Sequence, residues 1–243
     1  FESLREQRTG DDFRDICWTA SARRGKLVTR QYEIERRQTI WMLFDSGRLM
    51  RTRIGALSKL DLAVNAGLSL AEVALASGDQ VGVLTYARRV TARLPAGSGR
   101  AHLGRIVDRL AVTREEEWEA DHVQAASRLL IDQKRRSLVV WLTDLAETAM
   151  TPEVIRAASL LTARHVVLFV VTGQPDLVAL AARRPERAID MYESTAAQEL
   201  IQHRAALLAK LRANGALTVE ATSSRLAPAL VNAYLEVKQR GVL

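Results

Sequence analysis

With 243 residues, 48% hydrophobic and only 5% aromatic, the chain is long enough for one sizeable core, and its composition favours an α/β fold over an all-β sandwich. The net charge of +7 is interleaved with acidic residues and lacks the aromatic and basic surface pattern of RNA-recognition sheets, which argues against nucleic acid as the main partner. The longest apolar run, around Val166 to Val171, is far shorter than the roughly 20 residues that cross a bilayer, and the single cysteine, Cys17, favours a reducing compartment such as the cytoplasm.

The first 38 residues differ in composition from the rest of the chain. They are dense in arginine and acidic residues, so residues 1–38 are predicted to form an N-terminal extension that packs on a domain spanning residues 39–243. Trp18 is expected to anchor this extension on the domain, and residues 27–32 to pair as an edge strand. The chain begins at Phe1 and has no signal-like region, which favours a piece of a longer protein.

Short apolar runs alternate with longer segments of helical period from Thr39 onward. This alternation is typical of repeated β-α units and of a doubly wound, mostly parallel sheet flanked by helices. The runs are rich in β-branched or bulky apolar residues and predict six strands, at 39–44, 81–86, 90–94, 138–143, 165–171 and 216–220.

Helices are predicted between and after these strands. Apolar residues recur at three- and four-residue steps from Leu57 to Val73, and the pattern stops at Gly78. Thr151 and Pro152 read as the start of another helix. Further helices are expected at 103–110, 123–130, 195–213 and 224–237.

Two of the predicted strands are each followed directly by an aspartate. Asp45 follows the strand at 39–44, and Asp144 follows the strand at 138–143. In a doubly wound sheet, ligands bind outside the carboxyl ends of the strands where the strand order reverses, because the connecting loops part there. If the two strands are neighbours, both carboxylates face one crevice that suits a hard cation. The alternative is that each aspartate caps a helix or holds a loop.

The sequence lacks the common motifs of nucleotide-binding proteins, hydrolases and zinc sites. It contains no P-loop, no nucleophile elbow and no dinucleotide glycine fingerprint, and the four histidines offer no pair at metal-ligand spacing. His165, at the start of a buried strand, is expected to be a structural histidine. The basic stretch from Arg23 to Arg37 is expected to be a solvated face, with a docking strip as the alternative.

Residues along nearly the whole chain resemble one bacterial family, known as domain of unknown function fifty-eight. The resemblance rests on Leu4-Arg5, Gly10-Asp11-Asp12, Arg14, Ile16, Trp18, Ser21-Ala22-Arg23, Gly25, Leu27, Arg30 and Glu33, and continues through Asp45, Ser58-Lys59, Asp61, Gly78-Asp79, Val81-Gly82, Leu138-Val139, Asp144 and Arg164-His165. Members resemble von Willebrand factor A domains, a Rossmann-type fold that matches the order of elements above. Many are encoded beside MoxR-type AAA+ ATPases, and they commonly carry membrane-spanning helices before this segment. The resemblance thus implies an adaptor or co-chaperone in the cytoplasm or at the cytoplasmic face of the inner membrane.

Von Willebrand factor A domains often hold magnesium in a metal-ion-dependent adhesion site, and the resemblance allows this motif to be examined residue by residue. After the first strand the motif reads aspartate, any residue, serine, any residue, serine, whereas this chain reads Asp45-Ser46-Gly47-Arg48-Leu49. Both motif serines are therefore replaced, and Arg48 adds a positive charge. Asp144 matches a further motif aspartate, and Ser98 is expected in the region of the motif threonine. The metal expectation is accordingly none, or weakly bound Mg²⁺ on Asp45, Asp144 and Ser98.

These observations predict a protein-interaction module rather than an enzyme. Its partner, a protein such as an AAA+ ATPase or the client of that ATPase, is expected at a crest along the carboxyl edge of the sheet formed by Asp45, Ser46, Gly47, Arg48, Ser98 and Asp144. Two alternatives stay open. One is a magnesium-dependent phosphoryl hydrolase that uses Asp45 as nucleophile. The other is a nucleic-acid or anionic-lipid binder that acts through the basic extension.

Overall fold

The computed structural model describes residues 3–8, 11–31, 37–145 and 151–241. The chain divides into two compact units, residues 1–36 and residues 37–243. This division lies close to the boundary expected after residue 38, while the packing of the extension on the domain stays a prediction.

The first unit is a small antiparallel pair of strands with a short helix between them. Strand β1 (Ser3–Glu6) pairs with β2 (Val28–Gln31), and α1 (Trp18–Arg24) lies between them in the chain. The strand expected at residues 27–32 therefore exists at Val28–Gln31, and its partner is β1. Trp18 is 66% exposed at the start of α1, and its anchoring role stays a prediction.

The second unit is built on one six-stranded sheet with the order β10-β9-β8-β3-β6-β7. Only β7 runs antiparallel to its neighbour, which confirms the predicted, mostly parallel α/β sheet. A separate two-residue hairpin, β4 (Arg53–Ile54) and β5 (Leu57–Ser58), precedes the first long helix. The strands of the main sheet are β3 (Thr39–Asp45), β6 (Gln80–Tyr86), β7 (Val90–Gly97), β8 (Leu138–Leu142), β9 (Val166–Thr172) and β10 (Leu217–Ala221).

The strand order reverses between β3 and β8. From β3 the chain builds outward through β6 and β7, and it then returns to the other side of β3 to build β8, β9 and β10. The parallel register places Phe44 beside Leu142, so the residues that follow the two strands leave the sheet at the same edge. The two strands that lead into Asp45 and Asp144 are thus neighbours at the reversal.

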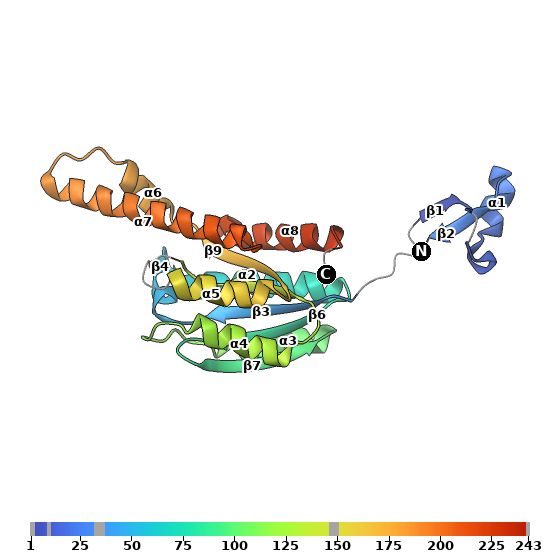
Figure 1. The fold of residues 1–243 in the computed structure, drawn as a ribbon, viewed down its shortest axis with the longest axis horizontal. Helices are drawn as coiled ribbons and strands as arrows, with labels where there is room; N and C mark the ends of the chain where they lie inside the picture. The colour runs from blue at the N-terminus through green and yellow to red at the C-terminus, as the bar shows by residue number, and fades with distance from the viewer. Residues whose placement is uncertain (1–2, 9–10, 32–36, 146–150, 242–243) are drawn as a thin grey trace. The chain divides into compact units, whose positions relative to one another are not determined.

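Successive side chains of the central strand face opposite sides, as the pleat of a strand requires. Ile40, Met42 and Phe44 pack with α2 (Lys59–Ala76), α3 (Arg100–Ala111) and α8 (Leu226–Gln239). Trp41 and Leu43 pack with α4 (His122–Asp132), α5 (Thr151–Thr162) and the second half of α7 (Ala188–Ala213). Each face of the sheet therefore has its own core and its own layer of helices (Figure 1).

The helix expected from Thr195 is longer than predicted. It begins at Ala188 as α7, and an additional helix that the sequence analysis missed, α6 (Pro175–Ala182), packs against it. At a rise of 1.5 Å per residue, α7 is roughly 39 Å long, and its first half extends beyond the sheet with α6 (Figure 1). This half packs on α6 rather than on the sheet, and Ile189, Met191 and Tyr192 remain exposed on it. The sequence of this half therefore shows no clear apolar stripe.

Short 3-10 turns complete the description, at Phe13–Asp15, Arg48–Arg51 and Ser223–Arg225. Among the helices of the described residues, none combines the length and the apolar character that a membrane crossing requires.

Alanine substitutions at two helical glycines are expected to change the unfolding free energy in opposite directions. A Cβ atom on Gly67 of α2 would lie 2.4 Å from Cζ of Phe44, whereas a Cβ on Gly104 of α3 would meet nothing within 4 Å. Gly67→Ala should therefore overpack the core and lower the free energy of unfolding by about 1–3 kcal/mol. Gly104→Ala should raise it by up to about 1 kcal/mol, because alanine favours the helix. Urea unfolding followed by circular dichroism measures both, and a stabilising Gly67→Ala would contradict the close packing of α2 on β3.

Candidate functional site

Asp45 ends β3 and is held by hydrogen bonds from its own chain. Asp45 is buried, with only 2% of its surface exposed. One carboxylate oxygen accepts a hydrogen bond from the backbone N–H of Gly47 at 2.7 Å, and the other accepts from the hydroxyl of Thr143 at 2.7 Å. Asp45 thus ties down the turn that follows β3, which is the loop-holding role considered as the alternative to metal binding.

The surroundings of Asp45 oppose its ionisation. Burial raises the pKa of this carboxyl group, and the nearby Asp144 acts in the same direction. His122 and the hydrogen bonds from Thr143 and Gly47 act in the opposite direction and offset part of the burial effect. A buried carboxyl group with both oxygens engaged is poorly placed to attack a phosphate ester.

Asp144 lies beyond the end of β8 and is paired with two cationic side chains. It forms an ion pair with Lys59, and the two side chains are each only 2% exposed. The other carboxylate oxygen lies 3.6 Å from a guanidinium nitrogen of Arg204. The same Arg204 also donates a hydrogen bond of 2.6 Å to the carbonyl oxygen of Thr172 at the end of β9.

The segment of residues 112–121, here called the roof segment, covers the turn after β3. The N–H of Glu116 donates to the carbonyl of Ser46 at 2.7 Å, and the N–H of Arg48 donates to the carbonyl of Trp118 at 2.9 Å. Ser46 is fully buried, and its hydroxyl donates to the carbonyl of Tyr86 rather than facing the surface. The roof segment therefore covers the Ser46 end of the predicted crest.

Gly47 packs directly beneath the roof segment. A Cβ atom at this position would lie 3.0 Å from both the Cβ and the backbone nitrogen of Ala120. The chain therefore has a packing reason for glycine where the metal-ion motif has its first serine. Among the predicted crest residues near this turn, Arg48 reaches the surface, where it pairs with Glu119 at 3.3 Å.

The prediction that Ser98 joins the crest is wrong. Strand β7 runs antiparallel to β6, and its last residue, Gly97, pairs with Val81 near the beginning of β6. Since Asp45 pairs with Tyr86 at the end of β6, Ser98 leaves the sheet at the opposite, amino edge. The error came from aligning Ser98 with a motif threonine without allowing for the reversed direction of the edge strand.

The residues at this edge do not fit a magnesium site. Mg²⁺ prefers octahedral coordination by oxygen. Here Asp45 accepts two hydrogen bonds, Asp144 is paired with Lys59, and the position of Ser98 lies at the far edge. Among the described residues no group of three or more histidine, cysteine or acidic side chains could hold a metal ion.

Comparison with known proteins identifies the family. The family model described as protein of unknown function DUF58 matches residues 3–182, which is well over half of the chain. The chain belongs to the DUF58 family. The resemblance found in the sequence is thereby confirmed. Helix α7, which begins at Ala188, lies beyond the matched residues.

The curated relatives of this DUF58 chain are themselves uncharacterized. Uncharacterized protein Mb1516 of Mycobacterium bovis is 26% identical over 173 residues, which cover 70% of this chain and 54% of that protein. Uncharacterized protein Rv1480 of Mycobacterium tuberculosis matches with the same identity and coverage. This chain therefore spans about half the length of the curated relatives that it matches.

Solved structures resemble this chain in fold at low sequence identity. The D319A mutant of the PilB minor pilin from Streptococcus sanguinis is 10% identical, with a TM-score of 0.54 over 89% of this chain and 65% of that chain. BatB from Bacteroides thetaiotaomicron is 13% identical, with a TM-score of 0.49 over 83% of this chain and 99% of that chain. The SpRpn10 VWA domain is 11% identical, with a TM-score of 0.44 over 81% and 94%. Domains of the von Willebrand factor A type are thus among the structural neighbours of this α/β fold.

Beneath the roof segment, three aromatic side chains form a buried polar network in this DUF58 domain. The indole N–H of Trp141 donates to the hydroxyl of Tyr86, and that hydroxyl lies 3.0 Å from Nδ1 of His122. Burial lowers the pKa of His122 and raises the pKa of Tyr86 well above its usual value.

His165, which was expected to be a structural histidine, lies elsewhere in the domain, where its Nδ1 is 3.1 Å from the hydroxyl of Ser137.

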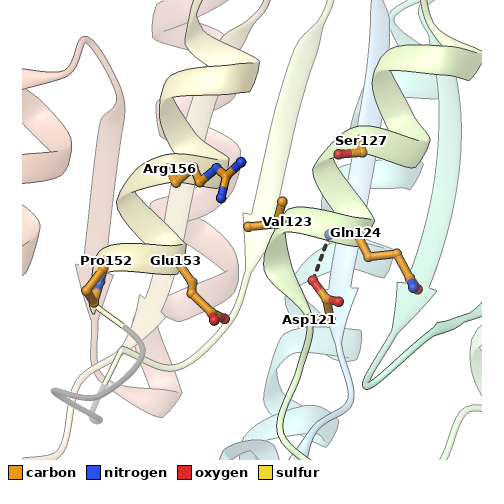
Figure 2. Close-up of a pocket in the computed structure, with 7 residues that line it drawn as sticks. All are labelled: Asp121, Val123, Gln124, Ser127, Pro152, Glu153 and Arg156. Carbon is orange, nitrogen blue, oxygen red and sulfur yellow. Dashed lines mark hydrogen bonds between the residues drawn. The ribbon is translucent and has the colours of Figure 1, made fainter.

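A groove of about 480 Å³ runs between α4 and α5. Asp121, which ends the roof segment and caps α4, lies on one wall, and Glu153 in the first turn of α5 points across from the other wall (Figure 2). Arg156 lies one turn further along α5 on the same side. The groove therefore carries charges of both signs and adjoins the carboxyl edge of the sheet.

Lys59, Arg204 and the roof segment are the features of this site that the sequence analysis missed. Lys59 is the first residue of α2, where a positive charge is disfavoured by the helix dipole, and this placement is a signal that the charge has another partner. Arg204 occurs within a helix whose other arginines and lysines are mostly exposed, so its sequence gives no such signal.

Restoring the first motif serine should not restore a metal site. Gly47→Ser places a side chain against Ala120, so we expect a loss of about 1–3 kcal/mol in unfolding free energy from overpacking. Adding Ala120→Gly should recover part of that loss, because it removes one of the two close contacts. Thermal unfolding with and without MgCl2 tests this, and a variant stabilised by Mg²⁺ would contradict the packing argument.

The pKa of His122 makes a prediction for pH dependence. Because burial lowers this pKa below the usual 6.5, the unfolded chain takes up the proton at a higher pH than the folded chain. The folded state therefore gains stability as the pH rises from the folded pKa to 6.5, by at most about 1.4 kcal/mol per pH unit. His122→Gln should flatten this dependence in urea unfolding between pH 5 and 7.5, whereas equal slopes in the two proteins would refute it.

Proposed function

We propose that this DUF58 domain is a non-enzymatic protein-interaction module that binds a partner at the carboxyl edge of its sheet. The observation that carries the proposal is the surface formed there by Arg48, Trp118 and Glu119, here called the edge surface. Trp118 is 60% exposed, and the guanidinium of Arg88 lies 5.4 Å from the centre of its ring. Exposed tryptophan and arginine side chains are frequent anchors of protein interfaces.

The partner that we propose is an AAA+ ATPase of the MoxR type or a client of that ATPase. This partner class comes from the resemblance in the sequence, and the whole protein, about half of which is matched here in the curated relatives, would then act as an adaptor or co-chaperone. We place the domain in the cytoplasm, where helices upstream of this segment would hold it at the inner membrane.

Metal bridging is not part of this proposal. Other members of the fold class can attract an acidic group of the partner through magnesium, but here the two carboxylates are buried and internally paired. The edge surface offers Arg48 as an exposed cation in the same turn. Arg48 pairs there with Glu119, so a partner would meet an arginine–glutamate pair beside Trp118 rather than a metal ion.

The enzyme alternative finds little support in the geometry. A phosphoryl hydrolase would need the Asp45 carboxylate to approach a phosphorus atom, yet Asp45 is buried and both of its oxygens accept hydrogen bonds. We expect no hydrolysis of phosphate esters in the presence of magnesium or manganese. Turnover that disappears in Asp45→Asn would favour the hydrolase instead.

The alternative of an anionic ligand concerns the first unit of the chain rather than the edge surface. The roof segment carries Glu115, Glu116, Glu117, Glu119 and Asp121, so it would repel nucleic acid and anionic lipid. If the basic extension bound such ligands, the affinity would fall steeply between low and moderate salt. We favour the protein partner because the exposed tryptophan lies at the edge surface.

Affinity for a purified MoxR-type AAA+ ATPase from the same organism tests the proposed interface. Trp118→Ala and Arg48→Glu should each weaken binding by roughly tenfold or more, which is typical of anchor residues. Arg100→Glu is the matched control, since Arg100 is exposed and follows Ser98 at the amino edge. Biolayer interferometry with purified proteins gives the dissociation constants.

Circular dichroism should show that all three variants keep the wild-type fold. Equal affinity of the edge variants and the wild type would exclude the edge surface as the interface. A loss confined to Arg100→Glu would move the interface to the opposite edge of the sheet.

A further inference from the structure

Lys59 is a buried lysine at a position where its charge needs compensation. It is the first residue of α2, directly after the Ser58 cap, and the positive end of the helix dipole lies at this terminus. The residue is only 2% exposed, so water cannot solvate the ammonium group. An unpaired buried charge of this kind is strongly destabilising, and the pairing with Asp144 removes that cost.

Asp144 lies between cations that come from the two faces of the sheet. Lys59 belongs to α2, which packs on one face, and Arg204 belongs to α7, which packs on the other. Arg204 is itself buried, with the carbonyl of Thr172 and, at 3.5 Å, the carboxylate of Glu220 as further contacts. A single carboxylate thus joins two helix layers at the end of β8.

We propose that the ammonium group of Lys59 is a built-in cation that occupies the role of a divalent metal ion at this edge and excludes such an ion from it. The inference rests on the proposed metal-independent function. It names Lys59 as the residue that replaces the metal ion. It also predicts how the thermal stability of the folded domain responds to added cations, which can be measured without any partner.

The charges at the site agree with this assignment. The buried carboxylates of Asp45 and Asp144 contribute at most two negative charges, and Lys59 and Arg204 contribute two positive ones, with the half-exposed Glu220 as a further carboxylate 3.5 Å from Arg204. A divalent cation placed beside Asp144 would be repelled by both basic groups in surroundings of low dielectric constant. One Asp144 oxygen has no hydrogen-bond partner and lies 3.6 Å from Arg204, so removal of Lys59 would leave this carboxylate without its close cation.

Thermal unfolding of Lys59→Ala tests the proposal. Loss of the buried pair should lower the melting temperature by on the order of 10 °C. MgCl2 at on the order of 10 mM, or methylammonium chloride, should restore several degrees in this variant and nothing in the wild type, each compared with NaCl of equal ionic strength. The smaller alanine leaves room for the added cation, whereas Lys59→Met fills the space and should show no recovery.

Lys238→Ala is the matched control. Lys238 also pairs with a buried aspartate, Asp79, at 3.0 Å, but its side chain is 29% exposed and belongs to α8. Its removal should cost stability without any recovery by magnesium or methylammonium. Recovery in both lysine variants would show a general ionic effect and overturn the assignment to Lys59.

A double variant keeps the proposal testable if Lys59→Ala does not fold. Lys59→Met with Asp144→Asn replaces the charged pair by neutral groups, and its melting temperature should exceed that of Asp144→Asn alone, in which the buried Lys59 has lost its carboxylate. In both of these variants Arg204 keeps the carbonyl of Thr172 and the carboxylate of Glu220. Independent, additive effects would overturn the proposed pairing. Stabilisation of the wild type by magnesium would also overturn it, and neither outcome depends on the affinity for an ATPase.

Discussion

The parallel pairing of β3 with β8 is the contact on which the rest of this structure depends. It makes the point of strand reversal, and it brings Asp45 and Asp144 to one edge although 98 residues separate Asp45 from its partner Thr143. Both strands are buried on both faces, so the residues that follow them lie where two helix layers meet. Any charge at this place must find its partner within the protein, and Lys59 and Arg204 are those partners for Asp144.

Pairing from both faces also explains how the edge is held in shape. Lys59 reaches Asp144 from the start of α2, and Arg204 reaches it from the middle of α7, where it also holds the end of β9 through Thr172. Buried ion pairs of this kind contribute little net stability, but breaking one partner is costly. The pairing therefore connects α2, α7 and β8 at this edge of the sheet.

Much of this architecture follows from local patterns in the sequence. The six strands, the helix that stops at Gly78 and the mostly parallel sheet are readable from apolar periodicity, a glycine stop and the alternation of β and α segments. The site was harder to predict, because its charges come from helices far apart in the chain. The Ser98 error shows the same limit, since an antiparallel edge strand reverses which end of the sheet a loop reaches. The start of α7 escaped prediction because a helix that packs only on another helix exposes apolar residues such as Tyr192.

Gly47 and the roof segment are two aspects of one packing arrangement. Glycine at position 47 allows Ala120 to approach the turn closely, and this approach brings Trp118 and Glu116 into hydrogen-bonding distance of the backbone of the turn. A side chain there would meet Ala120 at 3.0 Å and the Asp45 carboxylate at 3.1 Å, so one of these neighbours would have to shift. With glycine, Asp45 and Asp144 are buried and their partners lie within the protein. The same small residue thus accounts both for the closed turn and for the lack of a hydroxyl at this position.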